Sequence, residues 1–92
     1  MNEIEILDSS SNAVVAKYSE RNYPGLLLQG DTLRIVLDNL NELREELDAK
    51  DVSAAKEISD ELCNQFLSLL IHYEKILKDH NLALPYTNPV CR

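Results

Sequence analysis

The amino-acid sequence predicts an α+β fold in which a small three-stranded antiparallel sheet is followed by an antiparallel hairpin of two helices. Three short apolar segments separated by polar turns occupy the first 29 residues, which is typical of strands that pair in sequence order. Apolar residues then recur every three or four positions, the spacing of one helical face. Only two or three residues separate the two helical segments, which favours antiparallel neighbours. The chain, 1–92, is expected to form a single domain.

The strands are expected at Glu3–Asp8, Ala13–Tyr18 and Gly25–Gln29. In the first, Ile4 and Ile6 alternate with acidic residues, which predicts a strand with one buried face. The second is rich in β-branched residues at its start, and these favour strands. The third contains a short leucine run between two glycines and is interpreted as buried. A small sheet of this kind needs helices over at least one face.

Turn signals are concentrated around the third strand. Pro24-Gly25 predicts a type II turn, since proline presets its own φ and Gly25 supplies the positive φ that such a turn requires. Gly30 is expected to release the chain from the strand, and the Asp31 carboxylate is expected to cap the following helix. All four residues are therefore assigned structural roles.

The two helices are expected at about Thr32–Asp48 and Val52–His80. The break between them lies at residues 49–51, where the Asp51 side chain is placed to cap the second helix. The apolar positions of the first helix are Leu33, Val36, Leu37, Leu40, Leu43 and Leu47. The main stripe of the second helix is Ala55, Ile58, Leu62, Phe66, Leu69, Tyr73 and Ile76, with Leu77 beside its end.

The end of the second helix is also marked in the sequence. Asn81 is expected to take a left-handed conformation just beyond the helix, with Leu82 folding back onto the last turn. Pro85 and Pro89 keep the C-terminal tail, 83–92, irregular. This tail either packs along the sheet or is available to a partner.

The composition is acidic, with 16 acidic against nine basic residues and a formal net charge of −7. Nucleic-acid binding needs a basic surface, so neither nucleic acid nor an anionic membrane surface is expected as a partner. A basic protein partner is favoured instead, since complementary charge speeds encounter. The sequence shows no signal-peptide pattern at its start and no apolar run of membrane-spanning length, so a cytoplasmic location is expected.

The sequence offers little for catalysis or metal binding. Cys63 and Cys91 lie far apart and are expected to be free thiols in a reducing compartment. Together with His72 and His80 they lack the spacing of zinc ligands, so no metal and no cofactor are expected. The sequence contains no nucleophile elbow, phosphate loop or metalloprotease motif, and the protein is not expected to be an enzyme.

The first helix is predicted to carry an acidic face opposite its leucines. At about 100° per residue, the acidic side chains gather on that side, and two more extend the charge toward the hairpin turn. Like charges one turn apart cost helix stability, and acids at a helix C-terminus oppose its dipole. This face is either simply solvated or a docking surface for a basic partner. The candidate partner-binding residues are Asp38, Glu42, Glu45, Glu46, Asp48 and Asp51.

The middle of the second helix is apolar nearly all round. Leu67 and Ile71 project opposite the main stripe, and Cys63 lies between the two faces. A helix that is apolar on two sides is buried on two sides, either within its own chain or against a partner. Cys63, Leu67 and Ile71 are therefore a candidate interface, and a twofold homodimer is its simplest form.

One segment resembles a known family. The segment Arg21-x-Tyr23-Pro24-Gly25-x-x-x-Gln29-Gly30-Asp31-Thr32-Leu33 is similar to the mark of a group of small bacterial proteins. In that mark an Arg-x-aromatic-Pro-Gly turn and a short apolar strand lead through Gln-Gly-Asp-Ser/Thr-Leu into a helix. The resemblance covers about the first half of the chain. Some small acidic proteins of this kind are immunity proteins of interbacterial toxin systems, and the resemblance implies that role without assigning any catalytic residue.

Two functions are therefore expected as alternatives. In the first, a cytoplasmic immunity-type protein binds and occludes a basic toxin domain through the acidic helix, with Tyr18, Tyr23 or Tyr86 as an anchor for tight binding. In the second, a structural or regulatory homodimer forms through the second helix and has no toxin partner.

Overall fold

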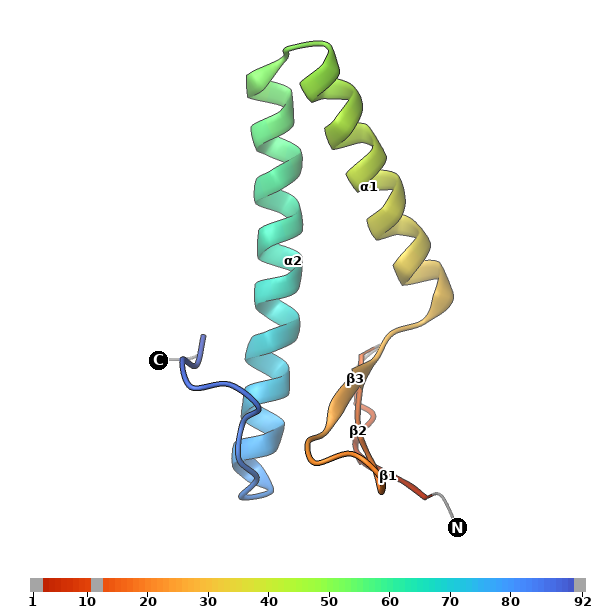
Figure 1. Ribbon diagram of the computed structural model, residues 1–92, viewed down its shortest axis with the longest axis vertical. Coiled ribbons are helices and arrows are strands. Elements are labelled where there is room, and N and C mark those ends of the chain that lie inside the picture. The colour runs from red at the N-terminus through yellow and green to blue at the C-terminus, as the bar shows by residue number, and fades with distance from the viewer. Residues whose placement is uncertain (1–2, 11–12, 91–92) are drawn as a thin grey trace. The chain divides into compact units, whose positions relative to one another are not determined.

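The computed structural model describes residues 3–10 and 13–90. It contains a three-stranded antiparallel sheet followed by two helices, so the predicted α+β fold is confirmed. Figure 1 shows these elements along the chain. They are β1 (Ile4–Asp8), β2 (Val14–Tyr18), β3 (Gly25–Leu27), α1 (Gly30–Asp48) and α2 (Val52–Asp79).

The chain divides into two compact units. The sheet unit comprises residues 1–28 and 68–92, and so contains the sheet, the last part of α2 and the tail. The hairpin unit comprises residues 29–67, which are α1 and the first part of α2. Helix α2 is therefore the element that both units share. The single domain over 1–92 stays a prediction.

In the sheet unit, β1 and β3 each pair antiparallel with the central strand β2. Ile4 lies opposite Tyr18 and Ile6 lies opposite Ala16, so these four side chains share one face. Val15 alternates to the other face, where its side chain is fully buried. Among the described residues, the core forms on the face of Val15.

The prediction that the isoleucines of β1 are buried is wrong. Ile4 is 65% exposed and Ile6 is 54% exposed, whereas Leu7 packs against the core. The register of β1 shifts between Ile6 and Asp8. Ile4 and Ile6 do share one face of the sheet, but the last part of α2 covers the opposite face, since its core residues pack against Val15.

The core of the sheet unit forms around Val15, Tyr73 and Leu77. The Tyr73 hydroxyl donates a hydrogen bond of 2.6 Å to the carbonyl oxygen of Pro24. A buried hydroxyl without a partner costs free energy, so this bond fixes where α2 meets the turn before β3. The partly buried apolar side chains around the core are Leu7, Leu26, Ile76, Leu82, Leu84 and Tyr86.

The predicted geometry of the Pro24-Gly25 turn is wrong. No described glycine has a positive φ, and Gly25 is the first residue of β3. A Cβ atom added at Gly25 or at Gly30 would meet no other atom within 4 Å. Neither glycine is therefore required by backbone conformation or by space. The structural role of this segment belongs to Pro24, which is buried and accepts the Tyr73 hydrogen bond.

Helix α1 begins two residues before the predicted start, so Asp31 lies in its first turn and does not cap it. The cap residue is Gln29, which is extended and makes no side-chain hydrogen bond to the helix. The Asp31 carboxylate accepts a hydrogen bond of 2.8 Å from the N–H of Thr32. Its negative charge still interacts favourably with the positive end of the helix dipole.

The turn between the helices is closed by Lys50 in the left-handed conformation, with φ 60°. Lys50 N–H donates to the Leu47 carbonyl at 3.0 Å, and Asp51 N–H donates to the Glu46 carbonyl at 2.9 Å. These two bonds form a Schellman motif. The Asp51 carboxylate accepts a bond of 3.0 Å from the N–H of Ala54, which confirms the predicted cap of α2.

The predicted end of α2 is also confirmed. Asn81 has φ 57°, and the N–H of Leu82 donates to the Leu77 carbonyl at 2.8 Å. Leu82 then packs against the core of the sheet unit. The tail contains no helix or strand over residues 83–90, as predicted, and residues 91 and 92 lie outside the described residues.

The two helices of the hairpin unit bury few side chains. Helix α1 has no buried residue, and in the first part of α2 only Ala55 and Leu62 are buried. Figure 1 shows α1 and this part of α2 diverging from their turn. The predicted apolar stripe of α1 is therefore divided, because Val36 and Leu43 are half-buried while its other members are exposed. We call these exposed members the leucine row: Leu33, Leu37, Leu40 and Leu47.

The left-handed residue of the hairpin turn gives a test of stability. Lys50→Gly is expected to raise the free energy of unfolding by about 1 kcal/mol, because glycine has no Cβ to clash in this conformation. Urea denaturation followed by circular dichroism measures the change. Lys50→Ala is the control, since it removes the same charge and keeps the Cβ atom. Equal stability of the two variants would contradict the assigned cause.

Candidate functional site

The six acidic residues singled out in the sequence do not form one uniform surface. Asp38 forms an ion pair of 3.1 Å with Arg34, and Asp51 caps α2. Glu46 is half-buried. The remaining three are exposed on α1, and no basic side chain in the described part of the chain pairs with them. They are Glu42, Glu45 and Asp48.

The net charge of the chain is concentrated in the hairpin unit. This unit has ten acidic and four basic residues, a net charge of −6. The sheet unit has six acidic and five basic residues, a net charge of −1. The two units therefore present different electrostatic surfaces, and nearly all of the attraction for a basic molecule comes from the hairpin unit.

The leucine row lies beside the acidic residues of α1. At about 100° per residue, Val36, Leu43 and most other half-buried positions of α1 flank the row on one side. Asp48 and Glu45 lie on its other side, together with the Arg34–Asp38 ion pair. Leu37 is 48% exposed and Leu40 is 47% exposed. Four leucines left open on one helix form an apolar surface of the kind that marks interaction sites. The sequence suggested these leucines as core, because their spacing fits an internal helix face equally well.

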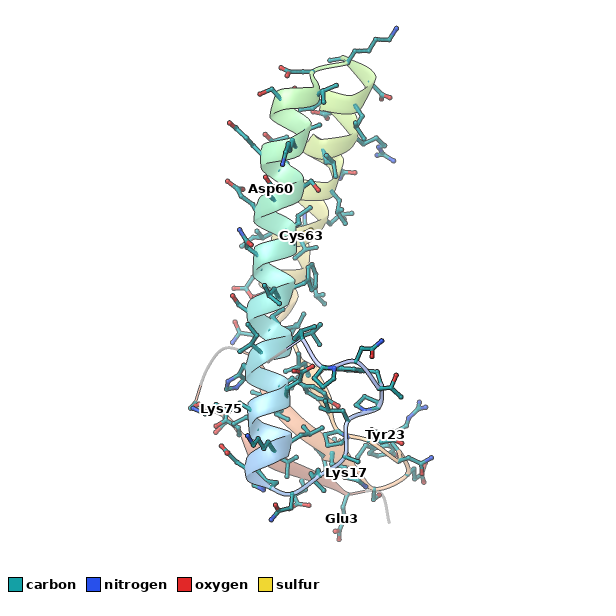
Figure 2. All side chains as sticks on the ribbon, turned by 90° about the vertical axis from the view of Figure 1, so that its left-hand side faces the viewer. Glu3, Lys17, Tyr23, Asp60, Cys63 and Lys75 are labelled. Carbon is teal, nitrogen blue, oxygen red and sulfur yellow. The ribbon has the colours of Figure 1, made fainter. Side chains whose placement is uncertain are left out.

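The candidate interface on α2 is open to solvent. Cys63 and Leu67, both in the hairpin unit, are exposed, and Cys63 is a free thiol. Ile71, in the sheet unit, is 40% exposed. Figure 2 labels Cys63 and Asp60 on α2, and the Asp60 carboxylate pairs with Lys56 at 3.3 Å. The charge beside Cys63 is therefore locally balanced, unlike that of α1. The prediction of a second free thiol at Cys91 falls outside the described residues.

Sequence reasoning missed a buried carboxylate in the sheet unit. Glu74 is only 5% exposed. Its Oε2 accepts a hydrogen bond of 2.6 Å from the Tyr86 hydroxyl and one of 2.9 Å from the N–H of Val90. A buried carboxylate must be compensated, and here the tail contributes two donors, so Glu74 holds the tail against α2. The available signal was a glutamate between apolar neighbours, Tyr73 and Leu77, on the core-facing side of the helix.

The tail and the end of α2 line an open hollow of about 540 Å³. Its lining combines apolar side chains with two lysines and Glu74. Tyr86 is committed to Glu74, so it is not free to act as an anchor for a partner. The residues that line the hollow are Glu74, Lys75, Lys78, Asn81, Leu82, Leu84 and Pro89.

The exposed face of the sheet carries a shallower hollow of about 270 Å³. Ile4, Ile6 and Leu27 lie there beside the two other candidate anchors, Tyr18 and Tyr23. The Tyr18 hydroxyl donates to the Glu20 carboxylate at 3.3 Å, while Tyr23 is 46% exposed. Figure 2 shows the position of Tyr23. This face is apolar, but it has none of the acidic residues that the sequence assigned to partner binding.

A histidine and a carboxylate meet where β1 approaches α2. His72 Nε2 lies 2.9 Å from Asp8 Oδ2, and the Ser10 hydroxyl donates to both oxygens of Asp8 at 2.9 Å. The hydrogen bonds from Ser10 are the main cause that lowers the pKa of Asp8, with His72 contributing less. The carboxylate stands between the hydroxyl and the imidazole. Since nucleophilic catalysis needs the imidazole beside the hydroxyl, this order stabilises the fold and does not activate Ser10.

The pKa values of two tyrosines in the sheet unit are raised. Burial raises the pKa of Tyr73. Burial also raises the pKa of Tyr86, and the hydrogen bond and negative charge of Glu74 raise it further.

Among the described residues no cluster of histidine, cysteine and acidic side chains could hold a metal ion. Neither described helix combines the length and apolarity that crossing a membrane requires.

The Tyr86–Glu74 contact predicts a loss of stability at alkaline pH. Because the pKa of Tyr86 is raised in the folded state, its stabilising effect is complete below the ordinary tyrosine value of about 10 and is lost as the pH rises above it. Tyr86→Phe is expected to be less stable than the wild type at pH 7, because Glu74 loses a donor. The stability difference between the two proteins is expected to shrink above pH about 10. Urea denaturation across this pH range measures it.

The matched comparison is Tyr73→Phe. Burial is the only cause of the raised pKa of Tyr73, so its substitution is expected to change the alkaline pH dependence less than Tyr86→Phe does. Parallel stability curves for Tyr86→Phe and the wild type between neutral and alkaline pH would show that the pKa of Tyr86 is not raised in the folded state.

Comparisons with known proteins give one match. No curated protein and no solved structure matches the chain. A family model described as "Family of unknown function (DUF6959)" matches residues 1–86. The match covers the sheet, both helices and the tail as far as Tyr86. The chain therefore belongs to this family of unknown function, DUF6959.

Proposed function

We propose that this chain is a non-catalytic binding protein that occludes a basic protein partner through its hairpin unit, in the manner of an immunity protein that blocks a toxin domain. The observation that carries the proposal is the net charge of −6 on the hairpin unit. Glu42, Glu45 and Asp48 are exposed there without an ion-pair partner among the described residues. Their charge is available to an external cation.

The mechanism consists of steering followed by steric exclusion. Complementary charge raises the rate of encounter by about 10- to 1,000-fold, and a toxin domain that acts on an anionic substrate presents a basic cleft. Carboxylates held on a helix can occupy such a cleft and keep the substrate out. The chain itself supplies no reactive group in this mechanism, so it performs no chemical step.

The sequence resemblance supports the immunity form of this proposal. The turn, strand and helix entry around Pro24 are similar to those of small bacterial proteins among which immunity functions are expected. An immunity protein must meet its toxin in the compartment where the toxin acts, which here is the cytoplasm. The free thiol of Cys63 on the surface is compatible with that reducing compartment.

Charge reversal tests the acidic surface. Glu42→Lys with Glu45→Lys is expected to slow association with a basic toxin domain, to be sought among the proteins encoded beside this chain, by about tenfold or more, because steering depends on this charge. Stopped-flow kinetics at low and high salt measures the rate, and survival of cells that co-express both proteins measures protection.

The control is Glu57→Lys with Glu61→Lys on α2. Both glutamates are exposed in the hairpin unit, and the double change alters the net charge by the same amount. Slow association in the first variant alone supports the α1 surface. Equal slowing in both variants would show that only the overall charge matters, and unchanged association in both would exclude this surface.

A homodimer through α2 is the second candidate function. Cys63 and Leu67 lie one helical turn apart and are both exposed. The Lys56–Asp60 ion pair balances the charge on this side of the helix, so a second copy could approach it without the repulsion expected at α1.

Leu67→Asp is expected to convert such a dimer to a monomer, because it places a charge in an apolar contact. Sedimentation velocity measures the change. Asn64→Asp, at another exposed position of α2, introduces the same charge and is expected to leave the dimer intact. A monomeric wild type would remove this candidate.

A further inference from the structure

We propose that the leucine row of α1 (Leu33, Leu37, Leu40 and Leu47) is the docking site for a basic amphipathic helix of the partner protein. This inference rests on the proposed binding function and specifies the chemistry of the partner. The inference concerns the apolar row and not the carboxylates beside it, so an experiment can contradict the inference without contradicting the proposed function.

The row is left open within the hairpin unit. Each of its leucines is roughly half exposed, from 47% at Leu40 to 57% at Leu47. The neighbouring positions of the same helix include Val36 and Leu43, which are half-buried. Within the hairpin unit, the buried side of α1 therefore does not include the row. Large apolar side chains that stay exposed along one line of a helix favour covering by another molecule.

The spacing of the row fits a helix better than an extended segment. The leucines are separated by four, three and seven residues, which are the steps between a and d positions of a heptad repeat. The row runs straight along the helix for about 21 Å at 1.5 Å per residue. A partner helix can insert its own apolar side chains between these leucines, the mode by which amphipathic helices bind.

The charge around the row selects a basic partner. Asp48 and Glu45 lie on one side of it at about 100° per residue, next to the Arg34–Asp38 ion pair, and the whole unit carries a net charge of −6. A second copy of this chain would bring another −6 against the same surface, and like charges across an interface disfavour association. A helix with lysine or arginine beside its apolar face meets the leucines and the carboxylates together.

One basic residue interrupts the row. Arg44 occupies the heptad position between Leu40 and Leu47, and its guanidinium donates a hydrogen bond of 3.0 Å to the Asn41 side chain. The guanidinium is thereby held by its own helix. The continuous apolar part of the site is Leu33, Leu37 and Leu40, and the variants that test it belong there.

The experiment uses the full chain and a synthetic probe helix. The probe is a fluorescent peptide with leucine at the a and d positions of a heptad repeat and lysine at e and g. A second peptide carries glutamate in place of lysine. Fluorescence anisotropy measures the dissociation constant of each peptide. The wild type is expected to bind the lysine peptide and not the glutamate peptide.

Leu37→Ser with Leu40→Ser is expected to lower the affinity for the lysine peptide by about tenfold or more, because the double substitution removes central apolar contacts without changing the charge. The matched control is Ile35→Ser. Ile35 is 56% exposed on the same helix but lies away from the row, and its substitution is expected to leave the affinity unchanged. Both sites are exposed, and circular dichroism checks that both variants keep their helices.

Three results would overturn the inference: equal affinity of the double variant and the wild type, equal loss in Ile35→Ser, or equal binding of the two peptides. Sedimentation supplies a fourth, since a wild-type dimer lost in the double leucine variant would make a second copy the occupant. If charge reversal at Glu42 and Glu45 slows association with the toxin domain but the leucine variant binds that domain normally, the proposed function stands and this inference fails. Mapping of the lysine peptide to the row, with no binding of any toxin domain, would remove the proposed function alone.

Discussion

The placement of Tyr73 in the core determines how the sheet unit holds together. Its ring packs with Val15 and Leu77, and its hydroxyl is satisfied by the Pro24 carbonyl. The next residue, Glu74, holds the tail through Tyr86 and Val90. Two consecutive residues of one helix turn thus attach α2 to segments before and after it in sequence. In so small a core, each of these polar contacts carries a large share of the specificity, because an unsatisfied buried group costs more than the bond itself contributes.

The hairpin unit is stabilised by different interactions from those of the sheet unit. Its half-buried row on α1 includes Thr32, Asn39 and Glu46 beside Val36 and Leu43, and polar side chains at such positions contribute little hydrophobic stabilisation. The order of the unit comes largely from local interactions, which are the Schellman turn at Lys50, the Asp51 cap and ion pairs along each helix. A helix that buries so little of its apolar surface has that surface available for a partner. The sparse packing of this unit and its proposed capacity to bind a partner therefore have the same origin.

The proposed function depends on the difference in charge and packing between the two units. The sheet unit is nearly neutral and contains the buried polar network, while the hairpin unit is strongly acidic and exposes its leucines. In this proposal the acidic side chains of α1 speed the encounter with a basic protein, whereas apolar contacts contribute most of the affinity once the complex forms. Neither feature requires a reactive centre, and the Ser10–Asp8–His72 cluster has the wrong order of groups to be one.

The sequence by itself determined the order of the elements, the Asp51 cap and the left-handed Asn81, because these depend on hydrogen bonds and periodicity within a few residues. It also located the acidic residues of α1, since helical spacing alone places them. Only the tertiary structure decided which apolar faces are covered. Ile4, Ile6 and the leucines of α1 have the same patterning as buried residues, but burial depends on which distant segment packs against them. The same reason explains why Glu74 and the role of Pro24 escaped prediction. Their partners, Tyr86 and Tyr73, are distant in sequence, and no local rule connects a residue to a contact that folding alone creates.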